Sequence, residues 1–365
     1  MQTNLHRLND LGQSIWLDQL SRNILAEGEL EALIEKGLSG VTSNPSIFLK
    51  AITSSDIYDD QISTLVQKGF DAQEIYEALT VEDIQRAADQ LKPVYEKTAG
   101  EDGYVSLEAN PKIAYDTEAT IEEIRHLHKS VNRPNAMFKI PATEEGYPAI
   151  EQCLSEGINI NITLMFSMEQ YNDVAEAYLS GIEKYIESGG DPHNIASVAS
   201  FFVSRVDVKV DPQLEEHGAE EIKGRIAIAN AKMVYQRFTQ VFSGDRWEKL
   251  EAAGARIQRV LWGSTSTKNP DYPDTLYVDE LIGPYTVNTI PFETIEAFLN
   301  HGTVERTVDQ DLAAARSALE QIAALPIDLD KVTDELLEEG VQSFADDYEK
   351  LLSGLSQKAI ELQVA

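Results

Sequence analysis

The sequence is poor in cysteine and in long apolar segments. Its one cysteine, Cys153, excludes an internal disulfide framework and is typical of a reducing compartment. Because Cys153 lies in a helical pattern, we interpret it as a small core residue rather than a nucleophile. No apolar run approaches the roughly 18 residues of a membrane-spanning helix, and the polar segment 1–10 lacks the apolar core of a signal peptide. These absences predict a cytoplasmic protein that does not cross a membrane.

Positive charge is also scarce. The chain has 30 basic and 62 acidic residues, which gives a net charge of −32. This balance argues against nucleic acids and anionic membrane surfaces as partners. A small anionic substrate remains compatible with it, because binding one needs only a local cluster of positive charge.

Nucleotide and metal motifs are absent as well. The sequence contains neither G-x-x-x-x-G-K-[ST] nor G-x-G-x-x-G, the loops that cradle nucleotide phosphates. His126 and His128 are two residues apart in a predicted helix, so they face different directions and do not form a metal pair. We therefore predict no metal site and no cofactor.

The most informative segment that is present runs from Ala136 to Thr143. Six of its eight residues are apolar and Lys139 lies in the middle, a pattern that favours a buried strand. Burial penalises the charged ammonium group and lowers the pKa of a lysine. A lysine kept neutral in this way can attack a carbonyl group and form a Schiff base. Taken alone, Lys139 could equally reach the surface or pair with a carboxylate.

Short apolar segments alternate with helical patterns along the whole chain. The predicted strands are 14–18, 40–44, 104–108, 136–143, 157–166, 196–205, 259–264 and 285–290. The predicted helices are 27–37, 56–98, 116–129, 144–156, 167–190, 222–242, 293–300, 308–324 and 329–352, and a polar connection is expected over 207–217. This pattern indicates an α/β protein with a (β/α)8 TIM barrel. We predict one domain, 1–365, with extra helices after strand 2 and C-terminal helices, about 301–365, that pack on the barrel.

Polar side chains gather where these strands end. In such a barrel the carboxyl ends of the strands surround one pocket, so a lysine, two carboxylates and several hydroxyl and amide groups would converge there. This combination suits Schiff-base chemistry with general acid–base help. Each residue also has a simpler interpretation as a helix cap, a turn or a strand former. The residues are Asp18, Asn44, Glu108, Lys139, Asn161, Thr163, Ser200, Arg205, Ser264, Ser266, Asn288 and Thr289.

Two of these segments closely resemble signatures of the transaldolase family. The sequence GVTSNPSIF at 40–48 resembles the signature around the second strand, and MFKIPAT at 137–143 resembles the Schiff-base signature. Other matching pieces follow in order from Asp18 to the loop after Trp262. The resemblance therefore covers roughly residues 14 to 300.

The resemblance implies a role for each matching residue. Lys139 would form a Schiff base with a ketose phosphate, Asp18 would take the proton of the C4 hydroxyl, and Glu108 and Thr163 would hold a water that shuttles protons. Substrate would be bound by Asn44, Asn161, Ser200, Phe202, Arg205, Ser266 and Lys268, the last three at the phosphate. The family's pentose phosphate reaction moves a dihydroxyacetone unit from sedoheptulose 7-phosphate to glyceraldehyde 3-phosphate, without a metal or cofactor. We expect small sugar phosphates as partners and a monomer or homodimer.

Some positions depart from the family pattern. The loop 263–269 is one residue longer and has Lys268 in place of an arginine, Phe201 replaces the usual proline, and residues 301–365 match only loosely. Two alternatives remain. Related fructose-6-phosphate aldolases carry Gln and Tyr where this chain has Glu108 and Phe202, so both positions favour a transaldolase. A catalytically silent scaffold barrel is disfavoured by the intact acidic residues and lysine.

Overall fold

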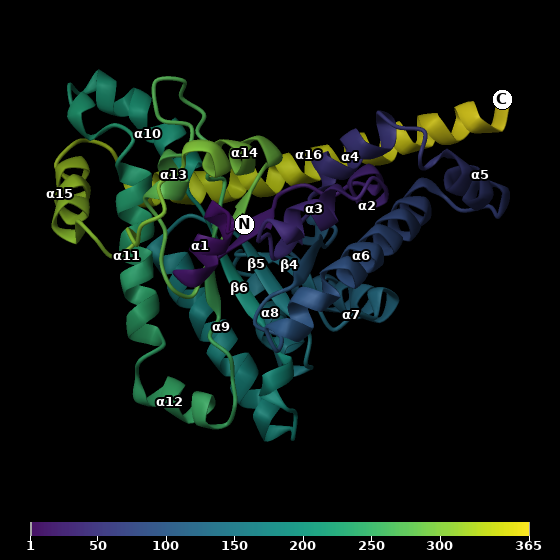
Figure 1. Ribbon diagram of the computed structural model, residues 1–365, viewed down its shortest axis with the longest axis horizontal. Coiled ribbons are helices and arrows are strands. Elements are labelled where there is room, and N and C mark those ends of the chain that lie inside the picture. Colours follow the sequence, from purple (N-terminus) through teal and green to yellow (C-terminus); the bar gives the residue numbers. More distant parts are fainter. Residues whose placement is uncertain (1, 365) are drawn as a thin grey trace.

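Eight parallel strands close into a barrel in the computed structural model, which describes residues 2–364 (Figure 1). Each strand pairs with its neighbours in sequence, and β8 pairs with β1. The predicted TIM barrel and its eight strands are thus confirmed. The strands are β1 Gln13–Leu17, β2 Gly40–Thr42, β3 Tyr104–Glu108, β4 Ala136–Pro141, β5 Ile160–Met165, β6 Ser197–Phe202, β7 Arg259–Gly263 and β8 Thr286–Ile290.

The strands are apolar because both of their faces are covered. Every residue of β4 and β5 is buried, as expected for parallel strands with side chains inside the barrel and helices outside. The register places Lys139 of β4 beside Glu108 of β3 and Asn161 of β5. Three polar residues from consecutive strands therefore share one level of the barrel.

Helices surround the barrel and extend beyond it (Figure 1). Ser167 and Gln170 form a capping box at the start of α9. The helices are α1 Asn4–Asp10, α2 Arg22–Ala26, α3 Glu29–Glu35, α4 Pro45–Thr53, α5 Asp59–Gln67, α6 Ala72–Lys97, α7 Thr117–Val131, α8 Gly146–Ser155, α9 Met168–Glu187, α10 Ser204–Glu216, α11 Ile226–Val241, α12 Asp245–Ala252, α13 Leu276–Asp279, α14 Phe292–His301, α15 Leu312–Ala323 and α16 Leu329–Val364, with short 3₁₀ turns η1 Pro111–Ile113, η2 Pro192–Asn194 and η3 Glu220–Ile222.

The prediction for residues 203–217 was wrong. β6 ends at Phe202 rather than at Arg205, and the expected polar connection is the helix α10. Val206, Val210 and Leu214 recur every four residues and are fully buried, which is the spacing of one helix face. Charged neighbours and Pro212 obscured this period. Arg205 consequently lies in the first turn of a helix and not at a strand end.

One helix near the second strand, α4, was not predicted. Pro45 begins it, because Asn44 accepts a hydrogen bond from the Ile47 amide at 3.1 Å and proline is tolerated in the first turn. The helical region predicted over 56–98 consists of α5 and α6, which are separated at the left-handed Gly69. Pro93 remains inside α6 and does not end it.

The last helix, α16, is longer than predicted and continues to Val364. It crosses beside α4 in Figure 1 and contacts α4, α5, α6, α10 and β5. Segments far apart in the chain are therefore joined over one end of the barrel by the 36 residues of α16.

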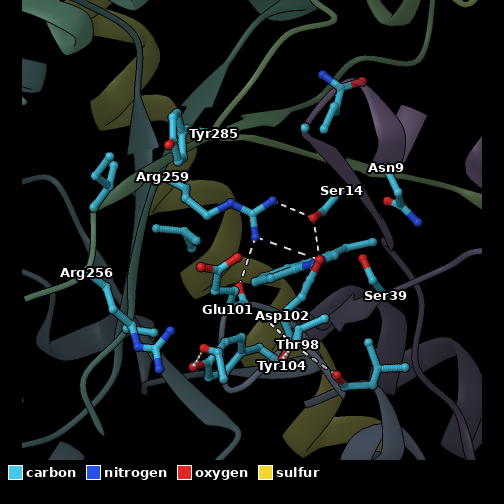
Figure 2. Close-up of a pocket in the computed structure, with 18 of the residues that line it drawn as sticks. Asn9, Ser14, Ser39, Thr98, Glu101, Asp102, Tyr104, Arg256, Arg259 and Tyr285 are labelled. Carbon is cyan, nitrogen blue, oxygen red and sulfur yellow. Dashed lines mark hydrogen bonds and ion pairs between the residues drawn. The ribbon is translucent and has the colours of Figure 1, made fainter. Parts of the chain in front are cut away.

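The amino ends of the strands are closed by the indole ring of Trp16 and by a network of polar side chains. The Trp16 indole lies inside the barrel against Gly40, where an added Cβ would be 2.5 Å from Trp16 Nε1. Asp102 accepts hydrogen bonds from Trp16 Nε1 at 2.8 Å and from the Ser14 hydroxyl. Arg259 of β7 donates to Ser14 and lies 3.7 Å from Asp102 (Figure 2).

This network borders a cavity of about 1080 Å³ at the amino end of the barrel. Arg259 also donates to the carbonyl oxygens of Thr286 at 2.9 Å and of Glu101 at 3.1 Å. One guanidinium thus connects β7, β8, β1 and the segment before β3. The network stabilises the end of the barrel opposite the strand termini that carry the predicted site.

Replacing Asp102 with alanine tests this role. Asp102→Ala leaves Trp16 Nε1 and the Ser14 hydroxyl without their buried acceptor and removes the anionic partner of Arg259, so we expect the free energy of unfolding to fall by about 3 kcal/mol. Glu101→Ala is the control, because the Glu101 side chain is exposed. This substitution should change the free energy of unfolding by less than about 0.5 kcal/mol. Urea unfolding measures both. Equal stability of the two variants would contradict a structural role for the network.

Candidate active site

A second cavity, of about 300 Å³, lies at the carboxyl ends of the strands. All but three of the predicted site residues line it. The exceptions are Glu108, Asn161 and Asn288, which are buried at 6%, 0% and 0% exposure and contact the lining residues Lys139, Ser200 and Thr265. The predicted residues that line it are Asp18, Asn44, Lys139, Thr163, Ser200, Phe202, Arg205, Ser266 and Lys268, together with Ser264 and Thr289.

Lys139 is buried and does not reach the surface. Its side chain is 7% exposed, and its Nζ donates a hydrogen bond to the Ser43 carbonyl oxygen at 2.9 Å. The same atom lies 3.3 Å from Glu108 Oε2. Burial raises the pKa of the Glu108 carboxyl above its ordinary value, although the charge of Lys139 opposes this rise. The pair therefore places a carboxyl group of raised pKa 3.3 Å from the lysine nitrogen.

Two buried oxygens close to this pair have no hydrogen-bond partner within residues 2–364. They are Glu108 Oε2 and Thr163 Oγ1. Thr163 also lines the cavity, and it follows Asn161, the residue aligned with Lys139, by two positions on β5. A buried polar atom without a partner is costly, so these two oxygens are suited to hold a small polar molecule beside Lys139.

A hydrogen-bonded chain orients Asn161 below the cavity. Its Nδ2 donates to Ser106 Oγ at 3.0 Å, and its Oδ1 accepts from Ser200 Oγ at 2.6 Å. These bonds link β3, β5 and β6 across the barrel interior. They hold the Ser200 hydroxyl at the cavity wall.

Asp18 follows β1 directly and is oriented by a threonine that the sequence did not single out. Thr42 Oγ1 donates to Asp18 Oδ1 at 2.9 Å and lies 2.6 Å from Thr289 Oγ1. Thr42 lies in the signature segment 40–48, and its inward position on β2 is the signal that could have identified it. The half-buried carboxylate of Asp18 faces the cavity together with Lys139.

Three donors suited to an anion line another part of the cavity. Arg205 packs over the Phe202 ring at 5.1 Å, and burial lowers the pKa of its guanidinium, an effect opposed by Asp18. No hydrogen bond or ion pair joins Arg205 to any side chain in the described part of the protein. Lys268 Nζ donates to Ser266 Oγ at 2.6 Å on the adjacent loop. A half-buried guanidinium without a carboxylate is a strong site for an oxyanion.

One further lining residue comes from outside the barrel. Phe344, in the middle of α16, contributes to the cavity wall. Sequence reasoning missed it, because nothing in the charged segment around it distinguishes this aromatic from an ordinary core residue. Among the described residues, no group of three or more His, Cys, Asp or Glu side chains is placed to hold a metal ion. None of the described helices is long and apolar enough to cross a membrane.

Comparison with known proteins agrees with this arrangement. Residues 15–355 match the family model described as Transaldolase/Fructose-6-phosphate aldolase. The chain is 46% identical over 370 residues to Transaldolase 2 of Nostoc sp., covering 97% of each chain. It is 45% identical over 377 residues to the transaldolase of Trichodesmium erythraeum, covering 99% of each. It is also 48% identical over 361 residues to the transaldolase of Acidothermus cellulolyticus, covering 98% of this chain and 97% of that protein. Similarity of this extent shows that the chain belongs to the transaldolase family of transferases and has transaldolase activity.

Proposed function

We propose that this transaldolase moves a dihydroxyacetone unit from sedoheptulose 7-phosphate to glyceraldehyde 3-phosphate, giving erythrose 4-phosphate and fructose 6-phosphate. The observation that carries this proposal is the buried Lys139 amine beside Glu108, under a cavity that also exposes Asp18 and the unpaired Arg205. We expect the enzyme to act in the cytoplasm as a monomer or homodimer.

Lys139 is the nucleophile in this proposal. Its neutral amine adds to the C2 carbonyl of the ketose phosphate, and loss of water gives the imine. The protonated imine then accepts the electron pair released when the C3–C4 bond breaks. The Lys139 ammonium group must lose a proton before it can attack, and the Glu108 carboxylate at 3.3 Å, whose pKa is raised, is placed to accept that proton.

Asp18 and a bound water divide the remaining proton transfers. Asp18 takes the proton of the C4 hydroxyl as the carbon–carbon bond breaks, and it returns a proton when the acceptor aldehyde becomes an alcohol. The Glu108 oxygen that is ion-paired with Lys139 and the Thr163 hydroxyl, neither of which has a hydrogen-bond partner among the described residues, would hold the water that shuttles protons during imine formation and hydrolysis. Asn44, Asn161 and Ser200 would bind the hydroxyl groups of the retained three-carbon unit.

The substrate phosphate would bind between α10 and the loop 263–269. Arg205 offers an unpaired guanidinium there, and Ser266 and Lys268 add a hydroxyl and an ammonium donor. Charge-assisted hydrogen bonds to phosphate are stronger than neutral ones. A local site of this kind is needed because a protein of charge −32 repels a phosphorylated sugar at long range.

A plain aldolase that releases free dihydroxyacetone is the second candidate. The Phe202 ring packs edge-on against Phe166, with 5.6 Å between the ring centroids, and lies under the Arg205 guanidinium. Because phenylalanine has no hydroxyl group, this side chain offers no proton to the carbanion. This absence of a proton donor favours transfer over release. An assay with fructose 6-phosphate, with and without erythrose 4-phosphate, separates the two activities, because only a transferase depends on the acceptor.

The Schiff base can be trapped. Reduction with borohydride in the presence of fructose 6-phosphate should fix a three-carbon adduct on Lys139, and Lys139→Ala should lose both the adduct and turnover. Lys268→Ala is the control, since Lys268 offers the cavity's other amine and its variant should keep the adduct on Lys139. Peptide mass spectrometry locates the adduct. An adduct on Lys268 in the wild-type enzyme would refute the assignment.

The role of Asp18 is tested by an isosteric change. Asp18→Asn keeps the volume and can still accept from Thr42, but it cannot take up a proton. We expect substrate binding and borohydride trapping of the intact ketose to persist while kcat falls by about 10² to 10⁴. If the variant kept more than about a tenth of the wild-type kcat, another group would have to be the base.

Arg205 should act through the phosphate. Arg205→Ala should raise KM for fructose 6-phosphate by about 10- to 100-fold, because a charge-assisted hydrogen bond is lost, and should change KM for unphosphorylated fructose by less than about threefold. Arg237→Ala is the matched control, because Arg237 is an exposed arginine on α11 that does not line the cavity. Steady-state kinetics provide both constants. Equal damage with both sugars would make Arg205 a structural residue.

A further inference from the structure

The C-terminal helix forms part of the catalytic cavity. Apart from Phe344, the residues that line this cavity come from the ends of barrel strands or from the segments that follow them. Phe344 lies more than 50 residues beyond β8 and in the middle of α16. A helix added after a complete barrel thus supplies one wall of the site.

Phe344 belongs to the buried face of α16 but is itself only half-buried. Gly340, Val341 and Tyr348, which flank it on the same face, are buried. Positions three or four residues apart share one side of a helix, so Phe344 points toward the barrel as they do. Its ring remains accessible because the catalytic cavity, rather than packed protein, lies beneath it.

Gly340 brings the same helix directly onto the phosphate end of the site. A Cβ at this position would lie 2.9 Å from Leu164 Cδ2 and 3.6 Å from Arg205 Nη1. The absence of a side chain therefore allows the α16 backbone to cover both residues. Phe344 follows one turn later, and its side chain and that of Arg205 line the same cavity.

Leu164, near the end of β5, has a backbone conformation that depends on its contact with Gly340 of α16. It adopts a left-handed conformation with φ of 61°, which is costly for a residue with a side chain. β5 also shifts register between Ile162 and Met165. The fully buried Leu164 side chain lies against Gly340, so packing on α16 offsets the strain of the residue that follows Thr163.

Ion pairs attach α16 on both sides of the cavity. Lys209 of α10 pairs with Glu335 at 2.8 Å and Glu339 at 2.7 Å, and Lys358 pairs with Asp59 at 2.6 Å and donates to the Ile52 carbonyl at 2.9 Å. Exposed ion pairs add little stability. They do fix the position of the helix along the cavity, while its apolar face provides the binding energy.

We propose that Phe344 is a specificity-determining residue, which excludes water from the Arg205 guanidinium and thereby selects phosphorylated sugars. With water excluded, a phosphate interacts strongly with Arg205. An unphosphorylated sugar bound in the same place would leave the Arg205 guanidinium with neither water nor an anion as its partner, which is unfavourable. This inference rests on the proposed phosphate site at Arg205.

The measurement is the ratio of kcat/KM for fructose 6-phosphate to kcat/KM for fructose, with a common acceptor. Phe344→Ala admits water to Arg205 and should reduce this ratio about tenfold, while borohydride trapping on Lys139 persists. Phe344→Leu keeps an apolar side chain and should retain most of the ratio. Leu337→Ala is the matched control, because Leu337 is a half-buried apolar residue of the same helix that does not line the cavity.

A glycine pair gives an independent test that leaves the Phe344 ring in place. Gly340→Ala should move α16 away from Leu164 and Arg205 and reduce the same ratio. Gly354→Ala makes the same change on the same helix, against Leu49 and Thr53, and should leave the ratio unchanged. Thermal unfolding establishes that each variant is folded.

Arg205→Ala separates the inference from the proposal beneath it. Suppose that Arg205→Ala collapses the ratio but that folded Phe344→Ala retains the wild-type ratio. The role of Phe344 is then refuted and the phosphate site stands. If Phe344→Ala does not fold, Gly340→Ala takes its place in this comparison. If Arg205→Ala leaves the ratio unchanged, the phosphate site itself is wrong and the inference falls with it.

Discussion

The structure depends on keeping an amine and a carboxyl group together inside a barrel. Lys139 Nζ lies 3.3 Å from Glu108 Oε2, and both side chains are almost fully buried. Removing either group would leave the other buried and unpaired, at a cost of several kcal/mol. The parallel register of β3, β4 and β5 makes the arrangement possible, since it aligns Glu108, Lys139 and Asn161 at one level. Hydrogen bonds from Lys139 to the Ser43 carbonyl and from Ser200 to Asn161 provide partners for the buried ammonium and amide groups of this level.

The two ends of the barrel differ in how their polar side chains are paired. At the amino end, Arg259, Asp102 and Ser14 satisfy one another and join strands that are distant in sequence. At the carboxyl end, Lys139 and Glu108 are paired, but Arg205 has no hydrogen-bonded or ion-paired side chain among the described residues, and the buried Thr163 hydroxyl has no hydrogen-bond partner there. The amino-end network therefore serves stability, whereas the Arg205 guanidinium is available for binding.

Much of this could be predicted from the sequence, for reasons that differ between parts. The strands were recognisable because each is a short apolar run that ends in a polar residue, and the position of Lys139 in one of these runs pointed to the site. Helix α10 was missed because Pro212 and its charged residues obscured the apolar period, so Arg205 was assigned to the wrong element. Thr42 was overlooked beside the more conspicuous Asn44. Phe344 could not be predicted, because its place in the cavity depends on the path of α16 over the barrel and not on any local pattern.

The location of Phe344 near the end of the chain has a consequence for biosynthesis. A ribosome that adds about 5 to 20 residues per second needs roughly 10 to 40 s to pass from Lys139 to Phe344. All eight strands leave the ribosome before α16 does, so the barrel and its reactive lysine can assemble while one wall of the cavity is still missing. A chain without α16 would lack the Phe344 side of the cavity and the packing of this helix on α4, α5, α6, α10 and β5. The cavity is thus completed only after every strand of the barrel has been made.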